Sequence, residues 1–266
     1  MLELLLFFVI VYLFALRCRS GHPGLKELQG WGYAHRGLHG NGVPENSMAA
    51  FKAALDHGYG IELDIHLLKD GNLAVIHDSL LNRTTGQPGT IEDLTTEDLK
   101  NHPLEGTEET IPEFMDVLTL YNGKAPLIVE LKPEGGNHAA LAEAACKMLD
   151  TYKGVYCLES FDPRCVAWLK KHRPDVIRGQ LSANFLKEKG DLPGYLKFAM
   201  THLLVNIMGT PDFVAYKFQD RKCSPSIWLC RNLWKAQSVT WTIRSQEDYD
   251  TALKEGWIPI FEYFTP

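Results

Sequence analysis

The chain has 266 residues, of which 45% are hydrophobic and 23% are charged, so it carries enough apolar material for one large core. Its formal net charge is -6, its pI is near 5.9, and no basic run interrupts it. This charge balance argues against a nucleic-acid-binding surface, and we expect no nucleic-acid partner. No feature of the sequence identifies a protein partner. Its six cysteines show neither a CxxC pair nor a zinc-type spacing, which is typical of small core side chains.

The N-terminal segment differs in kind from the rest of the chain. Residues 2–16 are apolar apart from one acid and one tyrosine, and Arg17 and Arg19 follow. The segment lacks the positive start and the small cleavage residues of a secretory signal. It is shorter than the roughly 20 residues that cross a bilayer, although flanking arginines can snorkel. We therefore expect residues 1–19 to form a single-pass membrane anchor, with a buried core helix as the alternative.

The arginines on the C-terminal side of this segment predict that the rest of the chain lies in the cytosol. Residues 20–30 contain three glycines and a proline, which indicates a linker. The main domain is then expected to cover residues 31–266.

Short strand-like runs alternate with helical patterns through this main domain. The expected strands are Gly32–His35, Gly60–His66, Leu73–His77, Leu127–Lys132, Val155–Phe161, Val176–Leu181, Leu203–Ile207, Val239–Ile243 and Trp257–Phe261. The expected helices are one from Met48 after an Asn46 or Ser47 cap, and those at Leu141–Leu149, Arg164–Lys171, Ile227–Lys235 and Glu247–Lys254.

Strands that alternate with helices predict a parallel sheet of the α/β class. Eight or nine such units in about 235 residues suit a closed TIM (β/α)8 barrel better than an open sheet. Residues from about 67 to 112 break the rhythm with polar, turn-rich sequence. We read residues 64–77 as a strand, a turn and a strand, and the remainder as a small insertion near the barrel mouth.

Charged side chains follow several of these strands. Glu62 and Asp64 share one face of their strand because side chains alternate, and Glu130 and Lys132 do the same on a later strand. Carboxylates that converge at strand ends form the oxygen-rich site that Ca²⁺ or Mg²⁺ prefers. The alternative is that Glu62 and Asp64 form salt bridges inside the barrel.

Two histidines, His35 and His77, follow apolar runs at other strand ends, each beside a charged neighbour. Histidine suits proton transfer near neutral pH, although a single one is more often a structural residue. Together with Arg36, Lys132 and a metal, the pair is suited to cleaving a phosphodiester. His39 and His66 lie close enough in sequence to line the same site.

The ordered set of motifs resembles the glycerophosphodiester phosphodiesterase family over nearly all of residues 31–266. The motifs are His35-Arg36-Gly37, Pro44-Glu45-Asn46-Ser47, Glu62-Leu63-Asp64, Lys69-Asp70-Gly71, His77-Asp78, Arg83-Thr84-Thr85-Gly86, Ile111-Pro112, Glu130-Leu131-Lys132, Ser160-Phe161-Asp162 and Trp241-Thr242. The resemblance implies a TIM barrel with a small insertion and a divalent metal, Ca²⁺ or Mg²⁺.

The resemblance also implies roles for single residues. Glu62, Asp64 and Glu130 would ligate the metal, and Glu45 would complete that site or bind substrate hydroxyls. His35 and His77 would be the acid and base, Arg36 and Lys132 would bind phosphate, and Trp241 would form part of the pocket wall. Arg244 and the ending Ile258–Glu262 depart from the family pattern, which affects the choice of head group.

We therefore expect metal-dependent hydrolysis of glycerophosphodiesters, the deacylated phospholipid head groups, to sn-glycerol 3-phosphate and an alcohol. One alternative is a related phosphodiesterase that acts on lysophospholipids, which a membrane anchor would favour. A second is a non-catalytic barrel that binds phosphodiesters, which the presence of both histidines opposes.

Overall fold

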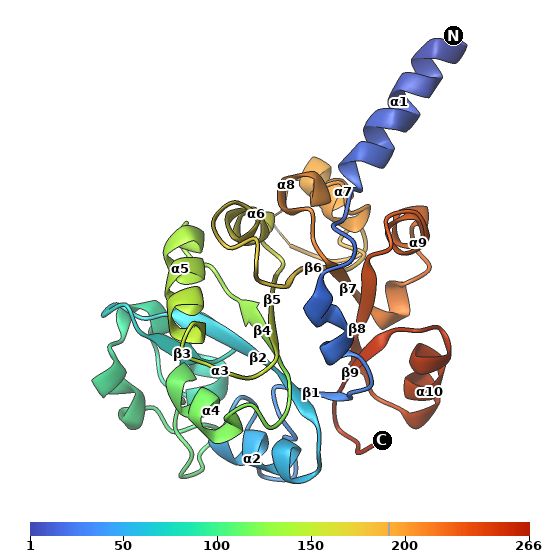
Figure 1. Ribbon diagram of the computed structural model, residues 1–266. Coiled ribbons are helices and arrows are strands. Elements are labelled where there is room, and N and C mark those ends of the chain that lie inside the picture. The colour runs from blue at the N-terminus through green and yellow to red at the C-terminus, as the bar shows by residue number, and fades with distance from the viewer. Residues whose placement is uncertain (191) are drawn as a thin grey trace.

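The computed structural model describes residues 1–190 and 192–266, and its centre is a closed barrel (Figure 1). Neighbouring strands follow the order β1-β9-β8-β7-β6-β5-β4-β2, and pairing of β1 with β2 closes the ring. These strands are parallel, whereas β3 pairs antiparallel with β2 outside the ring. The strands are β1 (Tyr33–His35), β2 (Gly60–Leu67), β3 (Leu73–Val75), β4 (Leu127–Leu131), β5 (Tyr156–Ser160), β6 (Arg178–Ser182), β7 (Phe213–Lys217), β8 (Gln237–Ile243) and β9 (Ile258–Phe261). The predicted TIM barrel is confirmed.

Helices surround the barrel and connect its strands (Figure 1). Two of them begin after side chains typical of helix starts: Ser47, one of the two predicted caps, accepts a hydrogen bond from the Ala50 N–H, and Asp162 caps the helix that begins at Pro163. The connecting helices are α2 (Met48–Asp56), α4 (Phe114–Tyr121), α5 (His138–Leu149), α6 (Pro163–His172), α7 (Gly194–Thr201), α8 (Asn206–Gly209), α9 (Pro225–Asn232) and α10 (Gln246–Lys254). Five of them match the helices expected from the sequence.

The segment expected as a linker, residues 20–30, packs against the barrel. It contains the 3-10 helix η1 (Pro23–Leu28), whose Leu25 and Leu28 are buried. Both leucines belong to the apolar cluster that fills the barrel interior, together with side chains such as Ile128 and Phe213. Burial of such side chains is worth about 1.5–3 kcal/mol each, so η1 stabilises the barrel as well as connecting to it.

The segment between β2 and α4 is the predicted insertion. Ile65 pairs with Val75 across a tight turn, which confirms the predicted strand, turn and strand. The short helices α3 (Asn82–Thr85), η2 (Ile91–Asp93) and η3 (Thr96–Asn101) follow β3. A separate apolar cluster that includes Ile76, Leu81 and Ile91 holds this segment together. The insertion therefore has a small core of its own beside the barrel.

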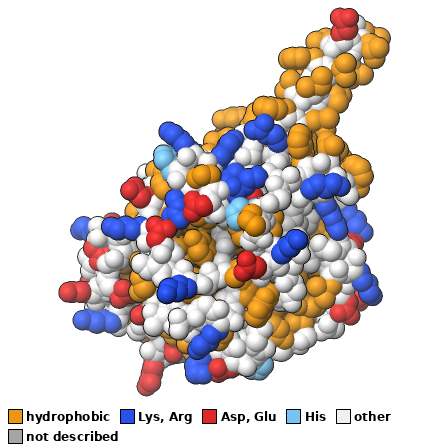
Figure 2. All heavy atoms as spheres, viewed as in Figure 1, with side chains coloured by type: hydrophobic (Ala, Val, Ile, Leu, Met, Phe, Trp, Pro, Cys, Tyr) orange, Lys and Arg blue, Asp and Glu red, His pale blue; other side chains and the backbone are white. Residues whose placement is uncertain are grey.

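The prediction of a single-pass membrane anchor with a cytosolic domain is wrong. The N-terminal helix α1 covers Leu2–Ala15, which is 14 residues and about 21 Å long, whereas the hydrocarbon core of a bilayer is about 30 Å thick. None of the helices in the described residues combines the length and the apolar character needed to cross a membrane. Apolar side chains nevertheless cover α1 where it projects from the barrel (Figure 2).

The chain joins the barrel directly after α1. Leu16 and Cys18 are buried in the main core, and the Arg19 guanidinium donates to the Asp212 carboxylate at 2.5 Å. Asp212 is buried and also accepts from the Arg178 backbone N–H. The arginines that suggested a membrane flank therefore include one that fastens the N-terminal segment to the barrel.

One predicted strand lies in the wrong place. Residues 203–205 form a turn, Asn206 and Ile207 begin α8, and the sixth strand of the ring is β7 (Phe213–Lys217) instead. Leu203 has a left-handed backbone with φ of 57°, which no β-strand accommodates. The apolar run there is explained by packing of Leu203 in the main core rather than by a strand.

Candidate active site

Three carboxylates meet inside the barrel at the carboxyl ends of neighbouring strands. Glu62 and Asp64 lie on β2, and the register places Asp64 beside Glu130 of β4. All three residues are buried, and each offers a carboxylate oxygen within 4.8 Å of the others. The structure therefore brings together three of the four residues predicted to bind metal. The fourth, Glu45, lies outside this trio and accepts hydrogen bonds from Arg36 and Arg83.

Burial and mutual repulsion set the protonation of this cluster. Burial and the charge of Asp64 raise the pKa of Glu62 well above its usual value. Burial raises the pKa of Glu130 to about 7, although Lys132 opposes the shift. Asp64 behaves differently, because His77, Lys132 and Arg36 lower its pKa despite its burial. The cluster thus holds fixed negative charge on Asp64 and two carboxyls that ionise reluctantly.

Sequence reasoning missed Glu159, a further carboxylate in this part of the barrel. It lies on β5 next to Glu130 in register, it is buried, and its Oε2 has no hydrogen-bond partner in the described residues. Burial and the charge of Glu130 raise its pKa well above the usual value. The sequence signal that could have identified Glu159 is the alternation along β5, because Cys157 and Glu159 occupy the inward-facing positions of this strand.

Two cations lie against the carboxylates. The Lys132 Nζ is 3.2 Å from Glu130 Oε1 and 3.6 Å from Asp64 Oδ1. The Arg36 Nε is 3.4 Å from Asp64 Oδ2, and the Asn46 amide also donates to this oxygen at 2.9 Å. The sequence suggested Asn46 only as a possible helix cap, with no role in the site, although it lies in one of the motifs. Together these groups fix the direction in which the Asp64 carboxylate points.

A tight turn carries Arg36 into this position. Arg36 has φ of 55° and Gly37 has φ of 81°, so two consecutive residues are left-handed. A Cβ on Gly37 would stand 2.7 Å from the backbone carbon of Ala50, which leaves room for glycine alone. The strained conformation of Arg36 costs free energy, and such strain is commonly found where a side chain must be aimed.

His35 is held by the end of the chain. Its Nδ1–H donates to Glu262 Oε1 at 3.0 Å, which leaves Nε2 facing Glu62 at 3.8 Å. Arg244 donates to the other oxygen of Glu262 from Nε at 2.8 Å. Burial lowers the pKa of His35, against the effect of Glu262, so the neutral imidazole with a free Nε2 is favoured. Sequence reasoning noted Arg244 and Glu262 only as departures, and only the folded chain shows that both support His35.

His77 is oriented in a similar way by Asp78. Its Nδ1–H donates to Asp78 Oδ1 at 2.6 Å, and Arg83 also donates to that carboxylate. Arg83 reaches on to Glu45 at 2.6 Å. Burial lowers the pKa of His77, although Asp64 opposes the shift. Both histidines therefore present an unprotonated Nε2 near neutral pH.

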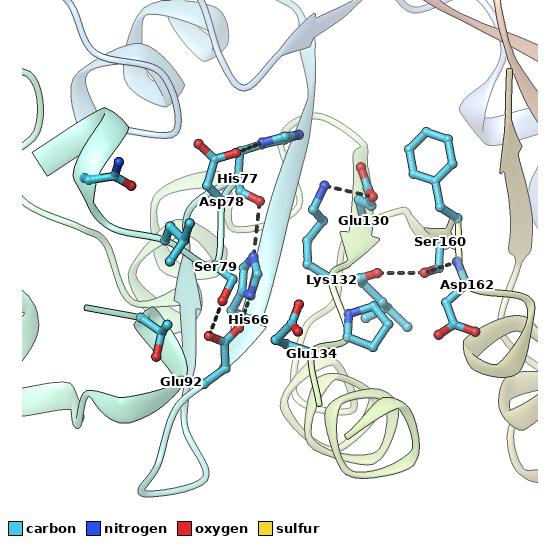
Figure 3. A pocket seen from close by; sticks show the side chains of 16 residues that line it. His66, His77, Asp78, Ser79, Glu92, Glu130, Lys132, Glu134, Ser160 and Asp162 are labelled. Carbon is cyan, nitrogen blue, oxygen red and sulfur yellow. Dashed lines mark hydrogen bonds and ion pairs between the residues drawn. The ribbon is translucent and has the colours of Figure 1, made fainter. Parts of the chain in front are cut away.

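Two hollows meet at His77. The inner one lies inside the barrel mouth, and residues lining it include His35, His77, Glu130, Phe161 and Trp241. The outer one is a pocket of about 850 Å³ between the insertion and the ends of β4 and β5 (Figure 3). In its wall, His66 and Ser79 both donate to Glu92, and His66 Nε2 lies 3.2 Å from the His77 carbonyl. His66 thus lines the site and braces the loop that carries His77.

Buried acids, two oriented histidines and two cations lie at the carboxyl end of a closed parallel barrel, which is where TIM-barrel enzymes carry their active sites. The model of the glycerophosphoryl diester phosphodiesterase family matches residues 35–213. The chain therefore belongs to that family of phosphodiesterases.

Individual relatives agree with this assignment. A glycerophosphodiester phosphodiesterase of Bacillus altitudinis is 46% identical over 107 residues, which is 38% of this chain and 43% of that protein. Glycerophosphodiester phosphodiesterase 1 of Mus musculus is 34% identical over 256 residues, 85% of this chain and 76% of that protein. A solved Oleispira antarctica phosphodiesterase, in complex with the product sn-glycerol-3-phosphate, has the same fold: its TM-score is 0.73 at 21% identity, covering 92% of this chain and 95% of that one.

Proposed function

We propose that the chain is a metal-dependent phosphodiesterase that hydrolyses glycerophosphodiesters to sn-glycerol 3-phosphate and an alcohol, with residues 31–266 as its catalytic domain. The observation that carries the proposal is the clustering of three buried carboxylates between two oriented histidines and two cations. The product named for the solved Oleispira antarctica phosphodiesterase supports the same substrate class.

The acidic trio fits a hard divalent cation, Ca²⁺ or Mg²⁺. Its donors are all carboxylate oxygens, and their mutual distances of at most 4.8 Å suit a single ion. Bringing three buried acids together without a cation is unfavourable, as the raised pKa of Glu130 shows. Glu62, Asp64 and Glu130 would hold the ion, which would neutralise phosphoryl oxygens and polarise the ester. We propose that Glu45 acts indirectly, by holding Arg36 and Arg83 in place.

The chain's own cations and aromatic groups position the substrate. Arg36 and Lys132 face the carboxylate cluster and would bind the phosphate oxygens that the metal leaves free. Trp241 and Phe161 pack edge to face with ring centres 5.5 Å apart, and both line the inner hollow. We propose that the glycerol moiety lies against these rings and that the alcohol occupies the outer pocket.

This placement assigns the proton transfers. His35 lines the inner hollow, and its free Nε2 would take the proton from the nucleophile, either water or the substrate's own glycerol hydroxyl, which would first give a cyclic phosphate. His77 lines both hollows; its Nε2, which is free in the neutral imidazole, would first take up a proton from solvent and would then donate it to the departing alkoxide. Glu262 and Asp78 would stabilise each imidazole when it carries the extra proton.

The test compares the products from glycerophosphocholine, glycerophosphoethanolamine and lysophosphatidylcholine, each with added Mg²⁺ or Ca²⁺ and after exhaustive chelation. We expect sn-glycerol 3-phosphate from the first two substrates in the presence of metal and none after chelation. The exposed His57→Ala variant is the matched control for His77→Ala. Full activity of the chelated, metal-free enzyme would overturn the metal dependence, and unchanged activity of His77→Ala would overturn the proton transfer.

A further inference from the structure

A second set of metal-ligand side chains lies behind His35, on the side away from the acidic trio. It consists of His35 at the end of β1, His39 in the following loop and Glu262 after β9. Each residue offers a donor atom within 4.8 Å of the other two. His35 Nδ1 is 3.0 Å and His39 Nε2 is 3.3 Å from the same oxygen, Glu262 Oε1.

The His39 nitrogen is poorly satisfied in this arrangement. Its side chain is 6% exposed, and Nε2 makes no hydrogen bond to any described residue, although Glu262 Oε1 is near. This weak contact compensates poorly for the hydration that the nitrogen loses on burial, so a ligand that binds Nε2 would be favoured. The His39 Nε2 atom points toward Glu262 Oε1, the oxygen to which His35 Nδ1 donates its hydrogen bond.

From this arrangement we infer that His35, His39 and Glu262 form a binding site for a zinc-type ion, and that the ion stops catalysis when it binds. Zinc takes imidazole nitrogens at about 2.0–2.1 Å and carboxylate oxygens at about 2.0–2.2 Å, so tetrahedral ligand atoms stand about 3.3–3.5 Å apart. The two measured N···O distances, 3.0 and 3.3 Å, are close to that spacing. Two imidazoles with one carboxylate favour zinc over Mg²⁺ or Ca²⁺, which prefer oxygen ligands.

The surroundings leave room for such an ion. Arg244 binds Oε2 of Glu262 at 2.7 Å and leaves Oε1 for the metal. A hollow of about 500 Å³, lined by residues that include His39, His57 and Glu262, gives access from the solvent. Water in this hollow can supply the fourth ligand.

Inhibition follows from the tautomer that the ion imposes on His35, and this half of the inference rests on the proposed function. Glu262 now keeps the proton of the neutral imidazole on Nδ1 and leaves Nε2 free. An ion on Nδ1 needs the lone pair of that nitrogen, so the proton moves to Nε2. His35 then has no lone pair for the nucleophile's proton. Because the outer pocket is untouched, kcat falls while KM for the substrate stays the same.

The experiment titrates zinc chloride into the full chain held in a large excess of Mg²⁺, and follows heat of binding and turnover of glycerophosphocholine in parallel. The variants are His39→Ala and, as the matched control in the same hollow, His57→Ala, each compared with its own zinc-free rate. We expect one zinc per chain to inhibit the wild type and His57→Ala. In His39→Ala, the dissociation constant and the half-inhibiting concentration should both rise at least about 10- to 100-fold.

If zinc instead inhibits by binding to the acidic trio, a tenfold higher Mg²⁺ concentration should relieve the inhibition. Relief by Mg²⁺, or equal inhibition of His39→Ala and the wild type, would overturn the proposed site. Circular dichroism checks that His39→Ala is folded. If it is not, cobalt(II) added to the Mg²⁺-loaded wild type decides, since the visible bands of a four-coordinate ion with nitrogen ligands are expected and their absence would refute the site. Zinc that binds with one-site stoichiometry without slowing turnover would support the site and overturn the role of His35, and with it the proposed mechanism.

Discussion

The raised pKa of Glu130 predicts that stabilisation by a divalent cation depends strongly on pH. Burial holds this carboxyl at a pKa of about 7, whereas its ordinary value is 4.5. Without metal, the folded state binds a proton that the unfolded state has released, so stability falls as pH rises from about 4.5 through about 7. A cation reverses this loss because it stabilises the ionised carboxylate.

The size of the effect follows from the same shift. Raising one carboxyl pKa from 4.5 to about 7 costs the ionised form about 3 kcal/mol. In a protein of this size, about 3 kcal/mol corresponds to roughly 6–12 °C in Tm. Below pH 7 the metal must displace the proton, so its apparent affinity should fall about tenfold for each pH unit.

Thermal unfolding is recorded at pH 5.5 and pH 8, without metal and with Mg²⁺ or Ca²⁺ at about 150 times its dissociation constant at pH 8, a concentration that stabilises the protein by about 3 kcal/mol. We expect a large upward shift in Tm at pH 8 and a small one at pH 5.5. Glu130→Gln removes one of the two proposed ligands with a raised pKa, so its metal shift should be smaller and should change less with pH, with Glu62 as the remaining titrating ligand. An equal metal shift at both pH values in the wild type would refute the reasoning.

Three further predictions concern the histidines and the turn beside them. His35→Ala and His77→Ala should each lower kcat by about 10²–10⁴-fold, and an aryl phosphodiester with a good leaving group should rescue His77→Ala alone; rescue of both or neither would contradict the assignment. Glu262→Gln should lower kcat by up to about 10⁴-fold through the wrong His35 tautomer, with KM little changed, so a loss confined to KM in steady-state kinetics would contradict it. Gly37→Ala should lower the free energy of unfolding by about 1–3 kcal/mol in urea titration, because its Cβ would meet the Ala50 backbone; an unchanged midpoint would refute this packing argument.

The sequence predicted the parts of the molecule that depend on local pattern. Alternation placed Glu62 and Asp64 on one strand face, and the strand-helix rhythm gave the barrel. The failures came where a local pattern had two physical readings. An apolar run is compatible with a strand and with a packed turn, as at Leu203, and an apolar helix is compatible with a bilayer span until its length of 14 residues is known.

The supporting residues of the site could not be predicted because they act across long stretches of chain. Glu262 lies 227 positions from His35 and becomes its partner only when β9 pairs with β1. Glu159 meets Glu130 only through the register of β4 and β5. Glu45 lies in a motif that indicated the site, yet its contact with Arg83 depends on the fold of the insertion.

The N-terminal attachment has a consequence for the order in which the chain folds during synthesis. Arg19 binds Asp212, and the Tyr12 hydroxyl lies 2.8 Å from the Ser226 hydroxyl. The residues that bind the N-terminal segment therefore leave the ribosome about 200 residues after it. Strand β1 likewise waits for β9 before the ring can close. At about 5–20 residues per second, the first segment remains without its partners for at least about ten seconds. During that interval Leu16 and Cys18, which are buried in the folded core, are exposed together with the open edge of β1, and the nascent chain is then most prone to aggregation.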